Sequence, residues 1–415
     1  MSLRHTISAL RFSRLTAVLL VLQTALACAI VCNALFFIAQ KMAPMLAATG
    51  VAAGQVLYVD QISFPGTVDP KTGNVGGGTN LANLRTMEAR VRALPNVQAV
   101  SIDLGMPYAD GFNAAGQWLN ERGDASTHAS LYFGDHLPDA LGLQLVEGRD
   151  FQPDEVTMIG MDGNMDASVV IISADVARRL FPTGHALGQR IVMGKEADAL
   201  RPVVVGVVRH LATRQPVDVE NANATVIMPI IPGDGFPMAS IVVRAKPGQR
   251  EALARTLPAL IMQTLHLSGA PRVRGFEAMR AAYFHANRNM ILLLLGVSLA
   301  VVAITVIGIM GLTGFWVQRR TRQIGIRRAL GATRGDILRQ FLLENFVVVG
   351  VGIVLGMLVA YAGNLWLMTH LEMSRLPLVW LPIGALVLWV LGQLAVLGPA
   401  RRAAAVPPVV ATRSV

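Results

Sequence analysis

Four runs of the sequence contain no charged side chain. They are Leu15–Gln40, Asn289–Gln318, Asn345–Thr369 and Leu376–Ala400. Crossing a hydrocarbon core of about 30 Å takes roughly 20 helical residues, so each run is long enough to span a membrane. The composition, 53% apolar and 15% charged residues, also differs from that of an ordinary soluble domain. The sequence therefore predicts an α-helical membrane protein with four transmembrane helices.

The first run follows three arginines and could be mistaken for a signal peptide. Its apolar stretch is longer than the roughly 7 to 15 residues of a signal-peptide core, and no small-residue cleavage pattern closes it. We therefore expect a retained helix at 15–40 after a short segment at 1–14. Cys28 and Cys32 both lie inside this helix, where we expect them to serve in helix packing.

Arginines mark one side of the expected membrane. They precede the first run (Arg4, Arg11, Arg14), separate the second from the third (Arg319, Arg320, Arg322, Arg327, Arg328, Arg334, Arg339) and follow the fourth (Arg401, Arg402, Arg413). Basic residues favour the cytoplasmic side. We therefore expect the cell inner membrane, with both termini (1–14 and 401–415) and the segment 319–344 cytoplasmic, and with residues 41–288 and a short loop at 370–375 outside.

This topology accounts for the net charge of +10. Residues 41–288 contain 22 Lys and Arg and 23 Asp and Glu, whereas the rest of the chain contains 14 and 3. A nucleic-acid-binding protein would carry a basic face on a folded domain. We therefore expect the membrane, and no nucleic acid, to be the reason for the basic charge.

Residues 41–288 are predicted to form a large α+β domain between the first two spans. Both of its ends show the order strand, helix, strand. The first half reads "QVLYVDQISF", "NLANLRTMEARVRALP" and "NVQAVSIDL"; the second reads "ASIVVRA", "GQREALARTLPALIMQTLHL" with an interruption at Pro258, and "PRVRGFEAM". Between the halves, residues 106–238 are richer in short strands and are interpreted as an inserted β-rich lobe.

Sequence signals of catalysis are weak. The stretch "GQRIVMGKE" (Gly188–Glu196) has one residue too many between its glycines for a phosphate-binding loop, and no Ser or Thr follows Lys195. The glycine-rich stretch Gly73–Asn80 is interpreted as a mobile loop. Asp135, His136 and Asp139 could supply metal ligands, although we favour a solvated loop there. We expect no catalytic residue, no metal site and no ATP hydrolysis by this chain.

The segment 319–344 contains helix-stop and helix-start signals in addition to the arginines that would set the membrane orientation. "RTRQIGIRRAL" is predicted to form a short helix that ends at Gly331. Thr333 and Asp336 then resemble a capping box that starts a helix continuing into the third span. A partner that binds such a helix could move both attached membrane helices. The alternative is that the arginines only enforce topology and bind anionic lipid.

At these residues the chain resembles the MacB/FtsX-like permeases, which are membrane subunits of type VII ABC transporters. "LVEGRDF", "ASVVIISADVARRLFPTGHALGQRI" and "PVVVGVVRHL" resemble the MacB-type periplasmic core, and "PARRAAAVPPVVATR" resembles the C-terminal ending of the family. The resemblance implies a MacB-type core domain at 41–288, built as a porter-like unit with an inserted lobe, and an FtsX-like permease domain at 289–400.

The resemblance also implies a function. A separate cytoplasmic ATPase would bind ATP and Mg²⁺, and its hydrolysis would drive conformational work of the periplasmic domain (mechanotransmission) for export of a peptide, antibiotic or lipid-linked substrate. The chain would need no cofactor itself, would pair with a second copy or a related permease, and would accept a periplasmic adaptor. The competing hypothesis is a membrane-tethered ligand-binding or sensory module that acts without ATP.

The implied ATPase-docking residues lie on the predicted coupling helix. They are Arg320, Arg322, Gln323, Ile324, Gly325, Ile326, Arg327, Arg328 and Leu330, with the helix stop and cap at Gly331, Thr333 and Asp336. Gln323 stands where the family usually has Glu, so a salt bridge from that position is not expected here.

Overall fold

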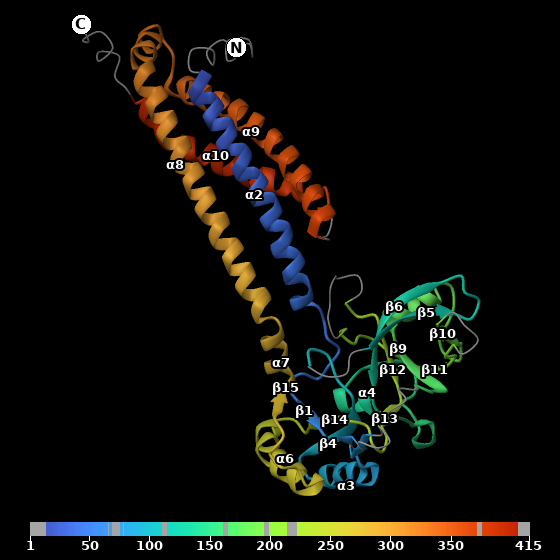
Figure 1. The fold of residues 1–415 in the computed structure, drawn as a ribbon. Helices are drawn as coiled ribbons and strands as arrows, with labels where there is room; N and C mark the ends of the chain where they lie inside the picture. The colour runs from blue at the N-terminus through green and yellow to red at the C-terminus, as the bar shows by residue number, and fades with distance from the viewer. Residues whose placement is uncertain are drawn as a thin grey trace. The chain divides into compact units, whose positions relative to one another are not determined.

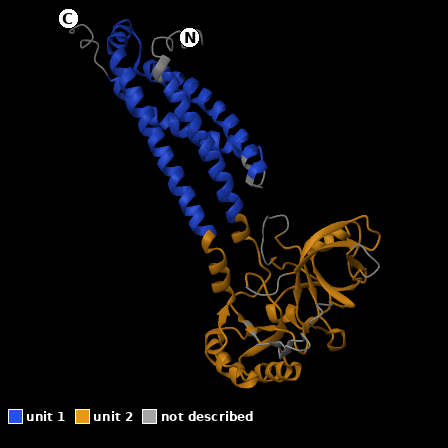
Figure 2. Cartoon of the chain, in the orientation of Figure 1, with its two compact units in different colours: residues 1–42, 287–415 blue, residues 43–286 orange. Residues whose placement is uncertain are grey.

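The structure, a computed structural model, describes most of the chain in two compact units. The described residues are 14–64, 66–68, 75–77, 79–109, 114–160, 165–194, 199–213, 222–371 and 376–405. Unit 1 comprises Met1–Met42 and Asn287–Val415, and unit 2 comprises Ala43–Ala286 (Figure 2). The predictions for residues 1–13, for Gly73, Asn74 and Gly78, for Lys195, for residues 372–375 and for residues 406–415 lie outside the described residues. Within the stretch predicted to be a mobile loop, Val75–Gly77 instead form a short strand.

The described residues include four helices that are long and apolar enough to cross a membrane. They are α2 (Arg14–Leu46), α8 (His285–Ala329), α9 (Arg334–Leu371) and α10 (Trp380–Ala404) (Figure 1). The prediction of four membrane helices is confirmed. A helix satisfies all of its backbone hydrogen bonds internally, which is why uncharged runs of this length become helices in a membrane.

In unit 1, helix α2 packs closely against α9 and α10 at glycines. A Cβ added at Gly356 would lie 2.5 Å from the Cβ of Cys28, and one added at Gly384 would lie 2.4 Å from the Sγ of Cys32. Both cysteines are fully buried. Small residues allow membrane helices to approach closely, so the two cysteines contribute to helix packing.

Unit 2 contains a four-stranded antiparallel sheet formed by the two ends of the domain. Its strands are β1 (Val56–Ser63), β4 (Val97–Asp103), β14 (Met238–Ala245) and β15 (Val273–Gly275), in the spatial order β15-β1-β14-β4. Helix α3 (Leu81–Arg92) connects β1 to β4, and α6 (Arg250–Leu265) connects β14 to β15. Two split strand-helix-strand units interleaved in this order form a ferredoxin-like arrangement.

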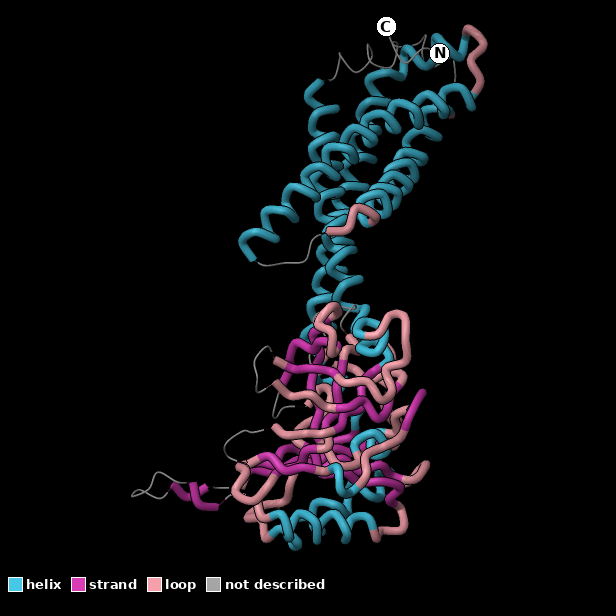
Figure 3. The backbone as a smooth tube through the Cα atoms, turned by 90° about the vertical axis from the view of Figure 1, so that its right-hand side faces the viewer, coloured by secondary structure: helices cyan, strands magenta, loops and turns pink. Residues whose placement is uncertain are grey.

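Alternation along the strands buries both faces of this sheet. Leu57 and Val59 on β1 join the cluster that contains α3 and α6, which lie side by side on one face (Figure 3). Val56 and Tyr58 belong to a second cluster on the other face, together with Tyr132 and Ile171 from the inserted segment. Successive strand side chains point to opposite faces, so one apolar strand contributes to both cores.

The inserted segment forms a mixed seven-stranded sheet. Its spatial order is β10-β5-β6-β12-β9-β11-β7, and the β12–β6 and β11–β9 pairs are parallel. The strands are β5 (Ala114–Asn120), β6 (Ser126–Phe133), β7 (Leu145–Gly148), β9 (Val169–Ser173), β10 (Ile191–Met193), β11 (Val203–Val208) and β12 (Thr225–Met228). All lie between residues 106 and 238, so the inserted β-rich segment is a sheet of its own within unit 2.

Shorter elements complete unit 2. Strand β8 (Thr157–Ile159) pairs in parallel with β13 (Ile230–Pro232), and β2 (Gly66–Val68) pairs with β3 (Val75–Gly77). The remaining helices are α4 (Leu137–Leu141), η2 (Pro153–Glu155), α5 (Ala174–Leu180) and α7 (Phe276–Tyr283).

Two predicted features of unit 2 are wrong. Helix α6 is not interrupted at Pro258 but runs through it. Leu253, Leu257 and Ile261 are fully buried on one face of α6, and this packing offsets the roughly 3 kcal/mol that an interior proline costs. Likewise, "PRVRGFEAM" is a strand only at Val273–Gly275, after which the chain turns into α7.

Candidate partner-docking site

The segment predicted to be a separate short helix is the end of a longer one. Residues 320–329 continue α8 without a break, so the prediction of an independent coupling helix is wrong. No proline lies between Gln318 and Leu330, and Gly325 alone costs only about 1 kcal/mol in a helix interior. The span and the docking segment therefore form one 45-residue helix.

Gly331 lies where α8 ends. Its φ of +101° is in the left-handed region, which glycine adopts without a steric cost. The Ala332 amide donates to the Arg327 carbonyl (3.1 Å), and the Gly331 amide donates to the Arg328 carbonyl (3.2 Å). This pair of bonds is a Schellman motif, which satisfies carbonyls left open by the end of the helix. The hydrogen bonds of this motif consequently hold the turn in one tight conformation.

Thr333 and Asp336 hold the start of α9. The Thr333 amide and hydroxyl donate to Asp336 Oδ2 at 3.0 and 2.6 Å, and the Asp336 amide donates to Thr333 Oγ1 at 3.2 Å. These reciprocal bonds form a capping box with Asp in the position that Glu or Gln usually takes. Only three residues, Leu330 to Ala332, lie between the last residue of α8 and the cap at Thr333, so the connection between the two helices is short.

Polar contacts brace the end of α8 against α9. Arg320 Nη1 pairs with Glu344 at 2.8 Å, and Gln340 Nε2 donates to the same carboxylate at 3.1 Å. The Glu344 side chain is 6% exposed, so this ion pair is largely removed from solvent. Closer to the turn, Arg327 Nη1 donates to Gln340 Oε1 at 2.6 Å. Moving α8 away from α9 would leave a buried charge without its partner, which is costly. These contacts therefore make the end of α8 and the start of α9 move together.

The predicted docking residues divide into a buried and an exposed set. Ile324 is 5% exposed and lies in one buried cluster with Ile337 and Phe341. Gly325 is also buried. These two residues hold α8 in place and are not part of an open docking face, which corrects their predicted role. By contrast, Ile326 is 49% and Leu330 83% exposed.

The exposed set combines apolar and basic groups. Arg322, Gln323 and Arg327 are exposed beside Ile326 and Leu330, while Arg320 and Arg328 are partly buried. Gln323 makes no hydrogen bond with any residue that the structure describes. This face therefore presents two large aliphatic side chains among guanidinium groups, a combination suited to an acidic partner surface with an apolar pocket.

The outer-domain residues considered as metal ligands have another role. Asp135 is buried, and its Oδ1 accepts hydrogen bonds from Ser101 Oγ (2.9 Å) and the Ile102 amide (3.1 Å). Its other oxygen pairs with Arg85. The solvated-loop interpretation is therefore wrong for Asp135, which ties α3 and β4 to the start of α4. Across the described residues, no cluster of His, Cys, Asp and Glu suits a metal ion.

One contact had no signal in the sequence. Arg280 Nη2 on α7 donates to the carbonyls of Met45 (2.8 Å) and Ala47 (3.0 Å), at the end of α2. More than 230 residues separate the donor from these acceptors, and backbone acceptors leave no trace in the residue types. This contact joins the chain segments that enter and leave unit 2.

Two protein-family models match this chain. The family model described as MacB-like periplasmic core domain matches residues 25–260, and the model described as FtsX-like permease C-terminal matches residues 295–408. The chain is 26% identical over 338 residues to the macrolide export ATP-binding/permease protein MacB of Neisseria gonorrhoeae, covering 77% of this chain and 50% of that protein. It is 27% identical over 320 residues to MacB 2 of Aeromonas hydrophila, covering 74% and 46%.

A solved structure is also similar. The periplasmic region of MacB from Actinobacillus actinomycetemcomitans aligns with 56% of this chain and 94% of that one, at 16% identity and a TM-score of 0.33. The chain spans about half the length, or less, of the curated relatives it matches.

Proposed function

Because the chain belongs to the MacB-like periplasmic core domain family and carries an FtsX-like permease region, we propose that it is the membrane subunit of an ABC exporter. A cytoplasmic ATPase partner would bind ATP and Mg²⁺. The chain itself would hydrolyse nothing and would convert the movement of that ATPase into conformational work of unit 2. Export is proposed because the curated relatives are named for macrolide export.

The observation that carries this proposal is the exposed face at the end of α8. Leu330 is 83% and Ile326 49% exposed, on a helix end that a Schellman motif and a buried ion pair hold rigidly. Ordering a flexible basic tail would cost conformational entropy on binding. A preformed face avoids that cost and can transmit force.

Helix α8 supplies the path for that force. Its 45 residues form one helix from His285 to Ala329, which at 1.5 Å per residue is about 68 Å long. Such a helix extends well beyond a hydrocarbon core of about 30 Å. Displacement at the Ala329 end would therefore reach His285, where the chain meets unit 2, without an intervening hinge.

The proposal also includes a topology and an assembly. The distribution of arginines supports an inner-membrane protein with both termini cytoplasmic. Two permease copies, or this chain with a related permease, would be drawn together by the ATPase, and a periplasmic adaptor would receive the cargo. A peptide, an antibiotic or a lipid-linked molecule fits the export function.

Docking is tested by changing the exposed apolar side chains. We expect Ile326→Asp and Leu330→Asp each to reduce the ATPase activity that co-purifies with the full chain about ten-fold or more, because a buried aliphatic anchor at an interface contributes about 2 kcal/mol. Leu378→Asp is the matched control, since Leu378 is 65% exposed but lies in the connection between α9 and α10. Normal ATPase recovery with both docking variants would contradict the proposal. Ligand binding by the purified chain in the absence of any ATPase would support the sensory alternative.

A further inference from the structure

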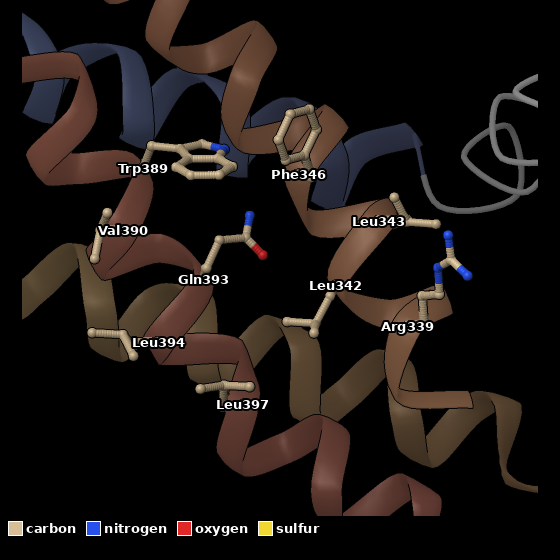
Figure 4. Close-up of a pocket in the computed structure, with 9 residues that line it drawn as sticks. All are labelled: Arg339, Leu342, Leu343, Phe346, Trp389, Val390, Gln393, Leu394 and Leu397. Atoms are coloured by element: carbon tan, nitrogen blue, oxygen red, sulfur yellow. The ribbon is translucent and has the colours of Figure 1, made fainter. Parts of the chain in front are cut away.

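Helices α9 and α10 form a groove within unit 1. This open groove has a volume of about 430 Å³, which is within the range of roughly 300–1,000 Å³ typical of small-molecule sites. Leu342, Phe346, Trp389 and Leu397 supply apolar walls (Figure 4). Phe346 and Trp389 meet edge to face, with ring centroids 5.1 Å apart, and define one end of the groove. The walls are therefore suited to a hydrocarbon chain.

A positively charged side chain lies at the opposite end of the groove. Arg339 lines it there and forms no hydrogen bond or ion pair with a residue that the structure describes. Arg401 and Arg402 follow Leu397 by about one turn of α10, so both helices contribute positive charge. Helix α9 carries two acidic groups: Asp336, one turn before Arg339 and attracted to it, whose carboxylate accepts the capping bonds of Thr333, and Glu344, which pairs with Arg320. The end of the groove keeps a net positive charge.

A polar group also lies inside the groove. Gln393 is one of its lining residues, and its Nε2 is buried without a hydrogen-bond partner among the described residues. Figure 4 shows the Gln393 amide between Trp389 and Leu342. A buried donor without an acceptor is costly, so a ligand that brings an oxygen into the groove would be stabilised there.

The occupant must combine an acyl chain, an ester or amide oxygen and an anionic head. We propose that the α9–α10 groove binds an anionic phospholipid of the surrounding membrane, with its phosphate at Arg339, a chain carbonyl at Gln393 and an acyl chain against Leu342, Phe346 and Trp389. Arg339 precedes the uncharged run that begins at Asn345, which places it at the depth of the headgroups. This inference is independent of ATPase docking.

The binding is measured by native mass spectrometry of the full chain, titrated with phosphatidylglycerol or with phosphatidylcholine of the same acyl chains. The wild-type protein should retain phosphatidylglycerol more tightly. Arg339→Gln should weaken phosphatidylglycerol binding about five-fold, the change that about 1 kcal/mol per arginine near an anionic surface corresponds to. Gln393→Leu should weaken binding of both lipids, because both carry chain carbonyls.

Arg334→Gln is the matched control, since Arg334 is exposed on α9 but does not line the groove, and it should bind like the wild type. The proposal is overturned if Arg339→Gln binds phosphatidylglycerol normally, or if Arg334→Gln weakens binding as much. It is also overturned if Leu394→Cys forms an intermolecular disulfide in membranes, because a second copy of the chain would then cover the groove.

Discussion

The hydrogen bonds of the Glu155 carboxylate are expected to make the stability of the fold depend on pH. Its two oxygens accept bonds from Arg149 at 2.5 and 2.8 Å, and the Gln152 amide donates to it at 2.8 Å. The hydrogen bond from Arg149 is the largest of the effects that lower the Glu155 pKa below 4.5. The resulting stabilisation is therefore complete above pH 4.5 and is lost as pH falls through the lowered pKa. We expect Glu155→Gln to lower the free energy of unfolding by only about 0.5–1 kcal/mol at pH 7, because Arg149 is partly exposed. The difference in melting temperature between the variant and the wild type should disappear in acid. A difference that stayed constant down to pH 3 would contradict this assignment.

Among the elements, the contact between α2 and α9 depends most directly on residue size. A Cβ at Gly356 would lie 2.6 Å from the Ala25 carbonyl oxygen, a backbone atom that cannot move aside alone. We expect Gly356→Ala to destabilise the full chain by about 1–3 kcal/mol, the usual cost of overpacking, seen as a lower melting temperature in detergent. Gly363→Ala on the same helix is the control, because a Cβ there meets nothing within 4 Å. That variant should be as stable as wild type or slightly more stable, since alanine favours helix. Equal behaviour of the two variants would show that α2 and α9 do not pack in this way.

At the scale of the whole molecule, Arg280 joins the chain segments that enter and leave unit 2. It holds the end of α2 to α7 through two carbonyls, next to Tyr108, whose pKa burial raises. Losing these charged hydrogen bonds should cost about 2 kcal/mol. We therefore expect Arg280→Met to speed amide exchange in residues 47–50 at least about ten-fold, measured by hydrogen exchange on the full chain. Arg288→Met, which removes an exposed arginine nearby in the sequence, should leave exchange there unchanged. Unchanged exchange with Arg280→Met would mean that the contact does not hold these segments together.

The features that could be read from residue types are those that depend on local forces. An uncharged run longer than the membrane core becomes a helix because a helix satisfies all backbone hydrogen bonds within the one segment that crosses the lipid. Strand and helix periodicity likewise predicted the two halves of unit 2, because burial of one face is already visible in the alternation. In the proposed docking segment, Gly331 could be singled out because few other residues adopt a positive φ easily.

Other features required partners that are remote in the sequence. Ile324 and Ile326 are chemically alike and two residues apart, yet only Ile324 is buried, because the face of α8 that is covered depends on where Ile337 and Phe341 lie. Pro258 stays inside α6 because its neighbours are buried against a sheet. Asp135 and Arg280 take their roles from acceptors and donors tens to hundreds of residues away. Periodicity and capping reflect interactions within a few residues, whereas burial and ion pairing reflect which distant segments are brought together.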